Sequence, residues 1–377
     1  MTAQRLTRFG EYIHARMAKR AKEVSEKTKR RVLSFGAGSP DIRPSSRYIE
    51  AYIKAVQEPQ SHLYPGYSAT PEFTDALVRW YHQRFNVVLK ATEIVPLLGA
   101  KDGTSHLPLA LLDDGDGLLV PDPGYPGFAG PLTMYGMEPQ YYPLTQDFKI
   151  DVALIEPRIT ERTKAIIVNY PSNPTGQIAT LDELRPVVAL AKKHNIVLIY
   201  DNAYAEIAFD GYKAPSILEI EGAKDVCVEF GSFSKTFSFA GYRMGWMVGN
   251  EQVCNALLQV KSQIDSGMSF PLQRLAAVAL TETDTAWQDA MIQEYTQRRD
   301  IIAKKLLGLG LTFEIPKAGL YIWAKIPPGQ GNSEEYCMRI LEEKQILFTP
   351  GSAFGPHGEG FLRVSICVNI DAINDYF

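Results

Sequence analysis

Five short apolar runs, separated by helical or loop segments, constrain the fold of this chain more than any other feature. They span residues 93–98, 117–120, 165–169, 196–200 and 225–230, and each is typical of a buried strand. Strands that alternate with helices indicate an α/β protein with a mainly parallel sheet. The segment 181–194 is predicted to be a helix that begins at a capping box, in which Glu183 follows Thr180 by three residues.

Candidate ligand residues follow directly after each of the five apolar runs. In chain order they are Gly99, Ala100 and Lys101, then Tyr125, then Asn173, then Asp201 and Tyr204, and finally Ser232, Ser234 and Lys235. Ligands of open α/β sheets bind outside the carboxyl ends of the strands. The sequence therefore predicts that these residues contribute to one site.

The chain has 377 residues, which is more than one hydrophobic core usually holds. We expect an N-terminal segment at 1–45 that packs with the small domain, a large domain at 46–270 and a small α+β domain at 271–377. An amphipathic helix is predicted within 11–31, and a long connecting helix followed by a loop at about 251–275. The last residues look helical, which predicts that the natural protein continues beyond them.

Charge and cysteine usage exclude several classes of protein. A formal net charge of -4 gives no reason to expect a nucleic acid or an anionic membrane as partner. The four cysteines form no CxxC pair, and the six histidines lack metal-binding spacing, so we expect no metal site and no disulfide framework. With no secretory or membrane-spanning run, a cytoplasmic protein is expected. Whether His357 contacts substrate is left open.

The segment from Ser232 to Gly245 reads SFSKTFSFAGYRMG and carries the strongest chemical signal. A lysine amine can form a Schiff base with an aldehyde cofactor such as pyridoxal phosphate, which also needs phosphate ligands close by. Lys235 would provide the amine, and Ser232, Ser234 and Arg243 would bind the phosphate. The glycine loop at 99–103, between a strand and a helix, would add backbone amides.

This segment resembles, position for position, the lysine signature of class I and II aminotransferases, which are pyridoxal phosphate enzymes of fold type I. The likeness extends from about residue 31 to 367 and is nearest to the bacterial subgroup of LL-diaminopimelate and aspartate aminotransferases. It implies a seven-stranded sheet in the large domain and a transaminase of the EC 2.6.1 type. It also implies a homodimer in which Tyr64 reaches the phosphate of the partner's site. The family usually has glycine where Ala69 stands here, which puts the path of this loop in doubt.

The resemblance also implies roles for individual residues. Asp201 keeps the pyridine nitrogen protonated, while Tyr204 and Asn173 hydrogen-bond the phenolic oxygen of the cofactor. Tyr125 stacks on the pyridine ring. The substrate is bound by Arg363, which takes the α-carboxylate, by Asn173 and by Gly38 in a segment that closes over it. Lys101 binds either the phosphate or a distal carboxylate of the substrate.

The implied reaction moves an amino group from an α-amino acid to 2-oxoglutarate, with LL-diaminopimelate, aspartate, alanine and aromatic amino acids as candidate donors. The same scaffold supports C-S lyases and other Cα-bond lyases, which stay an alternative. A pyridoxal phosphate-binding protein without catalysis is a remote alternative. Ser232 and Lys235 also match the S-x-x-K motif of penicillin-binding acyl-enzymes, but the accompanying Ser-Asp-Asn and Lys-Thr-Gly elements do not occur in the sequence.

Overall fold

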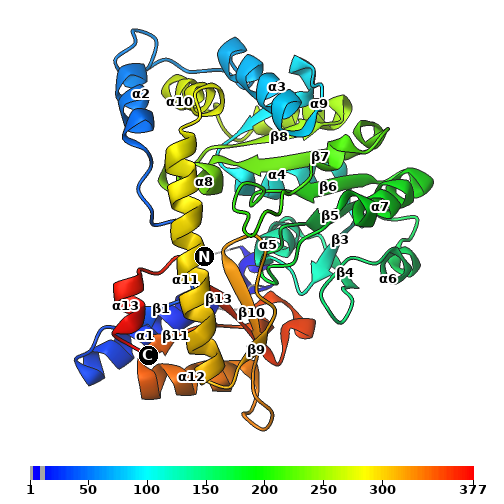
Figure 1. Ribbon diagram of the computed structural model, residues 1–377. Helices are drawn as coiled ribbons and strands as arrows, with labels where there is room; N and C mark the ends of the chain where they lie inside the picture. The colour runs from blue at the N-terminus through cyan, green and yellow to red at the C-terminus, as the bar shows by residue number, and fades with distance from the viewer. Residues whose placement is uncertain (1–2, 9–12) are drawn as a thin grey trace.

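A seven-stranded sheet is the largest element of the computed structural model, which describes residues 3–8 and 13–377 (Figure 1). The strands lie in the order β2 (Ile94–Leu97), β8 (Gly245–Gly249), β7 (Cys227–Ser232), β6 (Val197–Asp201), β5 (Thr163–Asn169), β3 (Gly117–Asp122) and β4 (Pro139–Pro143). Only β8 runs antiparallel to its neighbours in this sheet. The predicted α/β class with a mainly parallel sheet is therefore confirmed.

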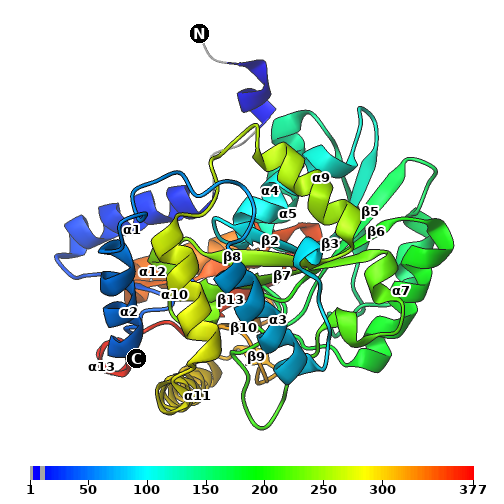
Figure 2. The same cartoon turned by 90° about the horizontal axis from the view of Figure 1, so that it is seen from above.

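Helices cover both faces of this sheet, as the view from above shows (Figure 2). One face packs against α4 (Ala100–Leu111), α5 (Pro126–Tyr135) and α9 (Glu251–Lys261), and the other against α3 (Pro71–Phe85), α7 (Leu181–His194) and α10 (Phe270–Thr281). Residues of β5 alternate between the two cores, with Ile166 and Val168 in one and Ala165 and Ile167 in the other. Burial on both faces explains why the strands are apolar without alternation. The predicted capping box of α7 is present.

A second hydrophobic core lies below the large sheet, around a small antiparallel sheet. Its strands are β12 (Thr349–Pro350), β13 (Phe361–Ser365), β10 (Tyr321–Lys325) and β9 (Thr312–Phe313), and they pack with α11 (Thr285–Gly308), α12 (Ser333–Lys344) and α13 (Ile370–Asn374). The N-terminal α1 (Ile13–Thr28) joins this core, and β1 (Leu33–Ser34) pairs with β11 (Ile346–Leu347). Tyr12 of the predicted first helix lies outside the described residues.

The predicted helix followed by a loop at 251–275 is present, but the helix is short and is not the long connecting one. That stretch holds α9, a loop and the start of α10, whereas the long helix is α11, with 24 residues. The apolar side chains of α10, among them Leu275 and Leu280, belong to the core of the large sheet. We therefore propose that the large unit extends through α10 to about residue 281, with α2 (Ser46–Val56) at its start.

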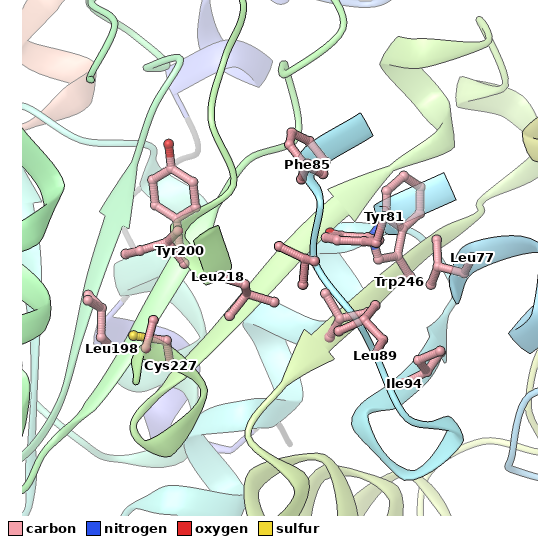
Figure 3. Packing of buried hydrophobic residues seen from close by; sticks show 14 of the residues in the cluster. Leu77, Tyr81, Phe85, Leu89, Ile94, Leu198, Tyr200, Leu218, Cys227 and Trp246 are labelled. Atoms are coloured by element: carbon pink, nitrogen blue, oxygen red, sulfur yellow. The ribbon is translucent and has the colours of Figure 1, made fainter. Parts of the chain in front are cut away.

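One carboxyl group lies deep within the core of the large unit. Glu229 on β7 is 1% exposed and accepts hydrogen bonds from the Tyr81 hydroxyl at 2.8 Å, the Ser216 hydroxyl at 2.7 Å and the Ile217 N–H at 3.0 Å. Figure 3 shows Tyr81 beside Trp246, whose indole N–H donates to the Tyr81 hydroxyl. Burial raises the pKa of the Glu229 carboxyl from its ordinary 4.5 to about 7.

This shift predicts how stability changes with pH. Because the folded protein favours the protonated carboxyl, the contribution of Glu229 is greatest at low pH and is lost as the pH rises through about 7. Relative to a Glu229→Gln variant, the wild type should lose roughly 2 to 3 kcal/mol of unfolding free energy between about pH 5 and pH 8. Urea unfolding of both proteins across this range measures the difference, and a constant difference would contradict the prediction.

Candidate active site

A cavity of about 610 Å³ lies between the carboxyl ends of the large-sheet strands and the small sheet. Most of the predicted site residues line it: Gly38, Ala100, Lys101, Tyr125, Asn173, Asp201, Tyr204, Ser232, Ser234, Lys235, Arg243 and Arg363. Gly99 is the N-cap of α4 at the edge of this group. The predicted convergence of five strand ends is thus what the fold produces, since these strands all run in the same direction.

Lys235 lies in α8 (Phe233–Thr236), a single helical turn that begins directly after β7. The Ser232 side chain caps this turn by accepting a hydrogen bond from the Ser234 N–H at 3.3 Å. The Lys235 ammonium donates to the Gly38 carbonyl at 2.8 Å and lies 5.6 Å from the centre of the Tyr204 ring. Lys235 lines the cavity, together with Asp201 and Arg363.

Backbone amides and a guanidinium group meet at the start of α4. Gly99 has a φ of 86°, which favours glycine, and a Cβ at this position would lie 2.6 Å from Arg243 Nη2. Arg243 is held by a hydrogen bond of 2.9 Å from its Nη1 to the Ala240 carbonyl. The N-terminus of a helix, a guanidinium group and the hydroxyls of Ser232 and Ser234 are suited to binding a phosphate.

Asp201 ends β6 and is 8% exposed. Burial raises the pKa of its carboxyl to about 6, against the opposing effects of the Ala203 N–H and the nearby Lys235. A carboxyl group held in this way gains most from a cationic N–H partner, such as a protonated pyridine nitrogen. Asn169 was not predicted from the sequence to belong to the site. Its side chain links Asp201 to Asn173, because it donates a hydrogen bond to the Asp201 carbonyl at 2.9 Å and accepts one from the Asn173 N–H at 2.8 Å.

Arg363 on β13 is 4% exposed, and its hydrogen bonds to Asn173 and Gly36 use only part of its five N–H donors. Its Nη1 donates to Asn173 Oδ1 at 2.8 Å and its Nη2 to the Gly36 carbonyl at 2.6 Å. Its Nε is buried without a hydrogen-bond partner among the described residues. An unsatisfied donor on a buried guanidinium group in a cavity is suited to an incoming carboxylate.

Tyr321 is a second residue that the sequence reading missed. Its ring lies 4.2 Å from the Arg363 guanidinium carbon, and its hydroxyl is 3.2 Å from the Tyr204 hydroxyl. A side chain at Gly38 would overlap the Tyr321 hydroxyl, so the close approach of these two segments requires glycine. Burial raises the pKa of the Tyr204 hydroxyl well above its ordinary value. Tyr204 is therefore a neutral hydrogen-bonding group at neutral pH.

Two residues that the sequence analysis considered for the site, Tyr64 and His357, lie apart from the cavity. Tyr64 is 87% exposed, in a loop whose Leu63 and Tyr67 are also exposed. His357 does not line the cavity, and its Nδ1 lies 2.7 Å from the buried Asp122 carboxylate. Neither residue reaches Lys235 within its own chain.

Asp102, His106 and Asp265 form the one cluster of potential metal ligands found in the described part of the chain. The Lys261 ammonium pairs with both of its carboxylates, so we propose no metal there. The four cysteines are free. None of the described helices has the length and apolar character that a membrane crossing requires.

The residues present fit pyridoxal phosphate on three counts. An available lysine amine, a buried carboxyl with a raised pKa and a phosphate-type set of donors surround one cavity. Each has the chemistry that one part of the cofactor needs, namely the aldehyde, the pyridine nitrogen and the phosphate.

Comparison with known proteins assigns the family. The family described as aminotransferase class I and II matches residues 30–375. The chain belongs to this family, which implies an aminotransferase that uses pyridoxal phosphate. It is similar to LL-diaminopimelate aminotransferase 2 of Trichormus variabilis, with 39% identity over 97% of this chain and 94% of that protein. The LL-diaminopimelate aminotransferase of Desulforudis audaxviator is 38% identical over 97% of this chain and 93% of that protein.

Solved structures agree with this assignment. The substrate-bound structure of BacF from Bacillus subtilis has a TM-score of 0.93 and 32% identity, covering 100% of this chain and 95% of that chain. An aspartate aminotransferase from Thermotoga maritima has a TM-score of 0.90 and 26% identity, covering 99% of this chain and 97% of that chain. The resemblance inferred from the lysine segment is thereby confirmed at the level of the family and the fold.

Proposed function

We propose that the protein transfers the amino group of an α-amino acid to 2-oxoglutarate, and that LL-diaminopimelate is the first donor to test. The observation that carries the reaction is the convergence of Lys235, Asp201 and Arg363 on one cavity. The choice of donor rests on the curated relatives, which are named as LL-diaminopimelate aminotransferases. Aspartate, alanine and aromatic amino acids are the other candidates.

Different residues of the cavity would bind different parts of the cofactor. Ser232, Ser234 and Arg243 hold the phosphate together with the amides at the start of α4. Asp201 would accept a hydrogen bond from the protonated pyridine nitrogen, and Tyr125 would pack on the ring. Tyr204 and Asn173 donate hydrogen bonds to the phenolic oxygen. The Asn173 amide can do so because its Oδ1 already accepts from Arg363.

When bound, the cofactor supplies an aldehyde that takes up the amino group and a ring that stabilises negative charge at the substrate Cα. Arg363 binds the α-carboxylate of the substrate and so orients the Cα–H bond toward Lys235. The Lys235 amine would then remove the Cα proton as a general base and hold it for its later return as a general acid. The second substrate, a keto acid, binds the same Arg363, which predicts ping-pong kinetics.

The exposed loop that carries Tyr64 supports a homodimer in which this residue reaches the phosphate of the partner's site. Leu63, Tyr64 and Tyr67 are 53%, 87% and 42% exposed, and Ile264 nearby in the fold is 49% exposed. Gly66 and Gly267 belong to two loops that touch, since a Cβ at Gly267 would overlap the Gly66 carbonyl. A cluster of exposed apolar side chains of this kind is typical of an interaction surface.

An absorbance titration tests the reaction and names its donor. Purified protein loaded with pyridoxal phosphate receives glutamate, aspartate, alanine, an aromatic amino acid or LL-diaminopimelate, without a keto acid. We expect LL-diaminopimelate and glutamate to convert the aldehyde form of the cofactor to its amine form. Pyruvate and ammonia released without an acceptor would instead assign the lyase alternative, and a protein that binds no cofactor would overturn the proposal.

A further inference from the structure

Lys261 on α9 is a buried lysine that has no part in the mechanism proposed above. Lys261, the last residue of α9, has a side chain that is 1% exposed. It pairs with the Asp102 carboxylate, which is 5% exposed, and with Asp265 Oδ2 at 2.7 Å. Removing an ammonium group from water in this way is costly, and the two carboxylates offset this cost.

Asp102 has a structural task at the start of α4. It is the third residue of the helix, and its Oδ2 accepts a hydrogen bond from the Leu98 N–H at 2.9 Å. This contact fixes the turn between β2 and α4, where Gly99 lies, against the first helical residues, Ala100 and Lys101. The amides of this turn form part of the proposed phosphate site.

The same carboxylate opposes the binding of a phosphate. A helix N-terminus attracts anions because its free N–H groups carry partial positive charge, and this field acts within the first turn. A negative charge on the third residue weakens that attraction, most strongly in a buried setting where the dielectric constant is low. Among the described residues, the ion-pair partners of Asp102 are Lys261 and His106, whose Nδ1 lies 2.6 Å from Oδ1.

We propose that Lys261 is a positioning residue for the phosphate of the cofactor, acting through Asp102. Its ammonium neutralises the carboxylate that holds the turn, so that the start of α4 keeps both its shape and its attraction for a dianion. The inference rests on the proposed function, since it requires pyridoxal phosphate in the cavity. It extends that function to a residue that does not line the cavity.

The test compares two probes that differ only in the phosphate. Dissociation constants of pyridoxal phosphate and pyridoxal are measured on the apo full chain at one fixed pH. For Lys261→Met, we expect the dissociation constant of pyridoxal phosphate to rise roughly 10- to 100-fold. That of pyridoxal should change by less than about threefold, because pyridoxal has no phosphate.

A double variant distinguishes an effect of the Lys261 charge from an effect of its packing. In the double variant Lys261→Met with Asp102→Asn, the carboxylate is removed with its partner, and most of the affinity for pyridoxal phosphate should return. The matched control is Lys224→Met, which removes an ion pair with the buried Glu93 at 2.9 Å, away from the cavity. Both dissociation constants should stay unchanged in this control.

Each other outcome decides against one of the two proposals. An equal loss of both probes in Lys261→Met, or no recovery in the double variant, would make Lys261 a purely structural residue. If Lys261→Met does not fold, Asp102→Asn alone decides. It should bind pyridoxal phosphate at least as tightly as the wild type, and selective weakening would overturn the inference. A wild type that binds neither probe would overturn the proposed function instead.

Discussion

Replacement of Lys235 by alanine should abolish transamination while leaving the fold intact. The proposed roles make this residue both the amine that holds the cofactor and the base that moves the Cα proton. Losing a general acid–base group alone costs about 100- to 10,000-fold in rate, so we expect a loss of roughly 10,000-fold or more. Steady-state assays with the donor found by the absorbance titration measure this change.

Folding should be little affected because Lys235 makes few contacts. Among the described residues, its ammonium has one hydrogen bond, to the Gly38 carbonyl at 2.8 Å, and such a bond contributes about 1 kcal/mol to stability. Thermal unfolding of the apo variant should therefore resemble that of the wild type. Borohydride reduction of the loaded proteins should fix the cofactor to the wild type only. Near wild-type turnover by a folded Lys235→Ala protein would refute the assignment.

The strands that the sequence predicted are those whose side chains are apolar on both faces. β3, β5, β6 and β7 are central and parallel, and burial on both sides requires continuous apolar runs. β2, the fifth predicted strand, lies at the edge of the sheet, but all its residues are buried. β4 was missed because Pro139 and Pro143 stand at its ends, as an edge strand allows. β8 was missed because Gly245 and Gly249 bound it directly after the lysine segment.

The length of α11 was not predicted for a related reason. Arg298 and Arg299 lie on its buried side, each 4% exposed, so its pattern of apolar residues is broken. Arg298 pairs with Asp41 and Glu294, and Arg299 with Asp210 and Asp300. These partners compensate a buried charge, and two of them, Asp41 and Asp210, come from distant segments that are not known before the chain is folded.

Some residues of the candidate site could likewise be predicted from the sequence, and others could not. Residues at strand ends could be predicted, because the direction of the strands alone brings them to one edge of the sheet. Tyr321 could not, since it comes from the small sheet and is 117 positions away from Tyr204, the residue it contacts. Asn169 reads as the end of an apolar strand, and Lys261 as a charged residue on the surface of a helix. Their roles depend on tertiary contacts.

Replacement of Arg363 should lower kcat/KM for both substrates, while the protein still binds the cofactor. A guanidinium group binds a carboxylate through two parallel hydrogen bonds, which lysine cannot reproduce and methionine cannot replace. We expect kcat/KM to fall roughly 100-fold in Arg363→Lys and roughly 1000-fold in Arg363→Met. Steady-state kinetics with the amino donor and with 2-oxoglutarate measure the two losses separately.

The two losses should be similar in size, because the α-carboxylate is the group that amino acid and keto acid share. The matched control is Arg299→Lys, a buried arginine that pairs with Asp210 at 2.7 Å and does not line the cavity. Arg299→Lys should change the free energy of unfolding but not the KM of either substrate. Since Arg363 also donates to the Gly36 carbonyl and to Asn173, thermal unfolding and cofactor absorbance must show that its variants stay folded and loaded. A loss confined to one substrate would mean that Arg363 recognises a side chain, and the α-carboxylate would then need another partner.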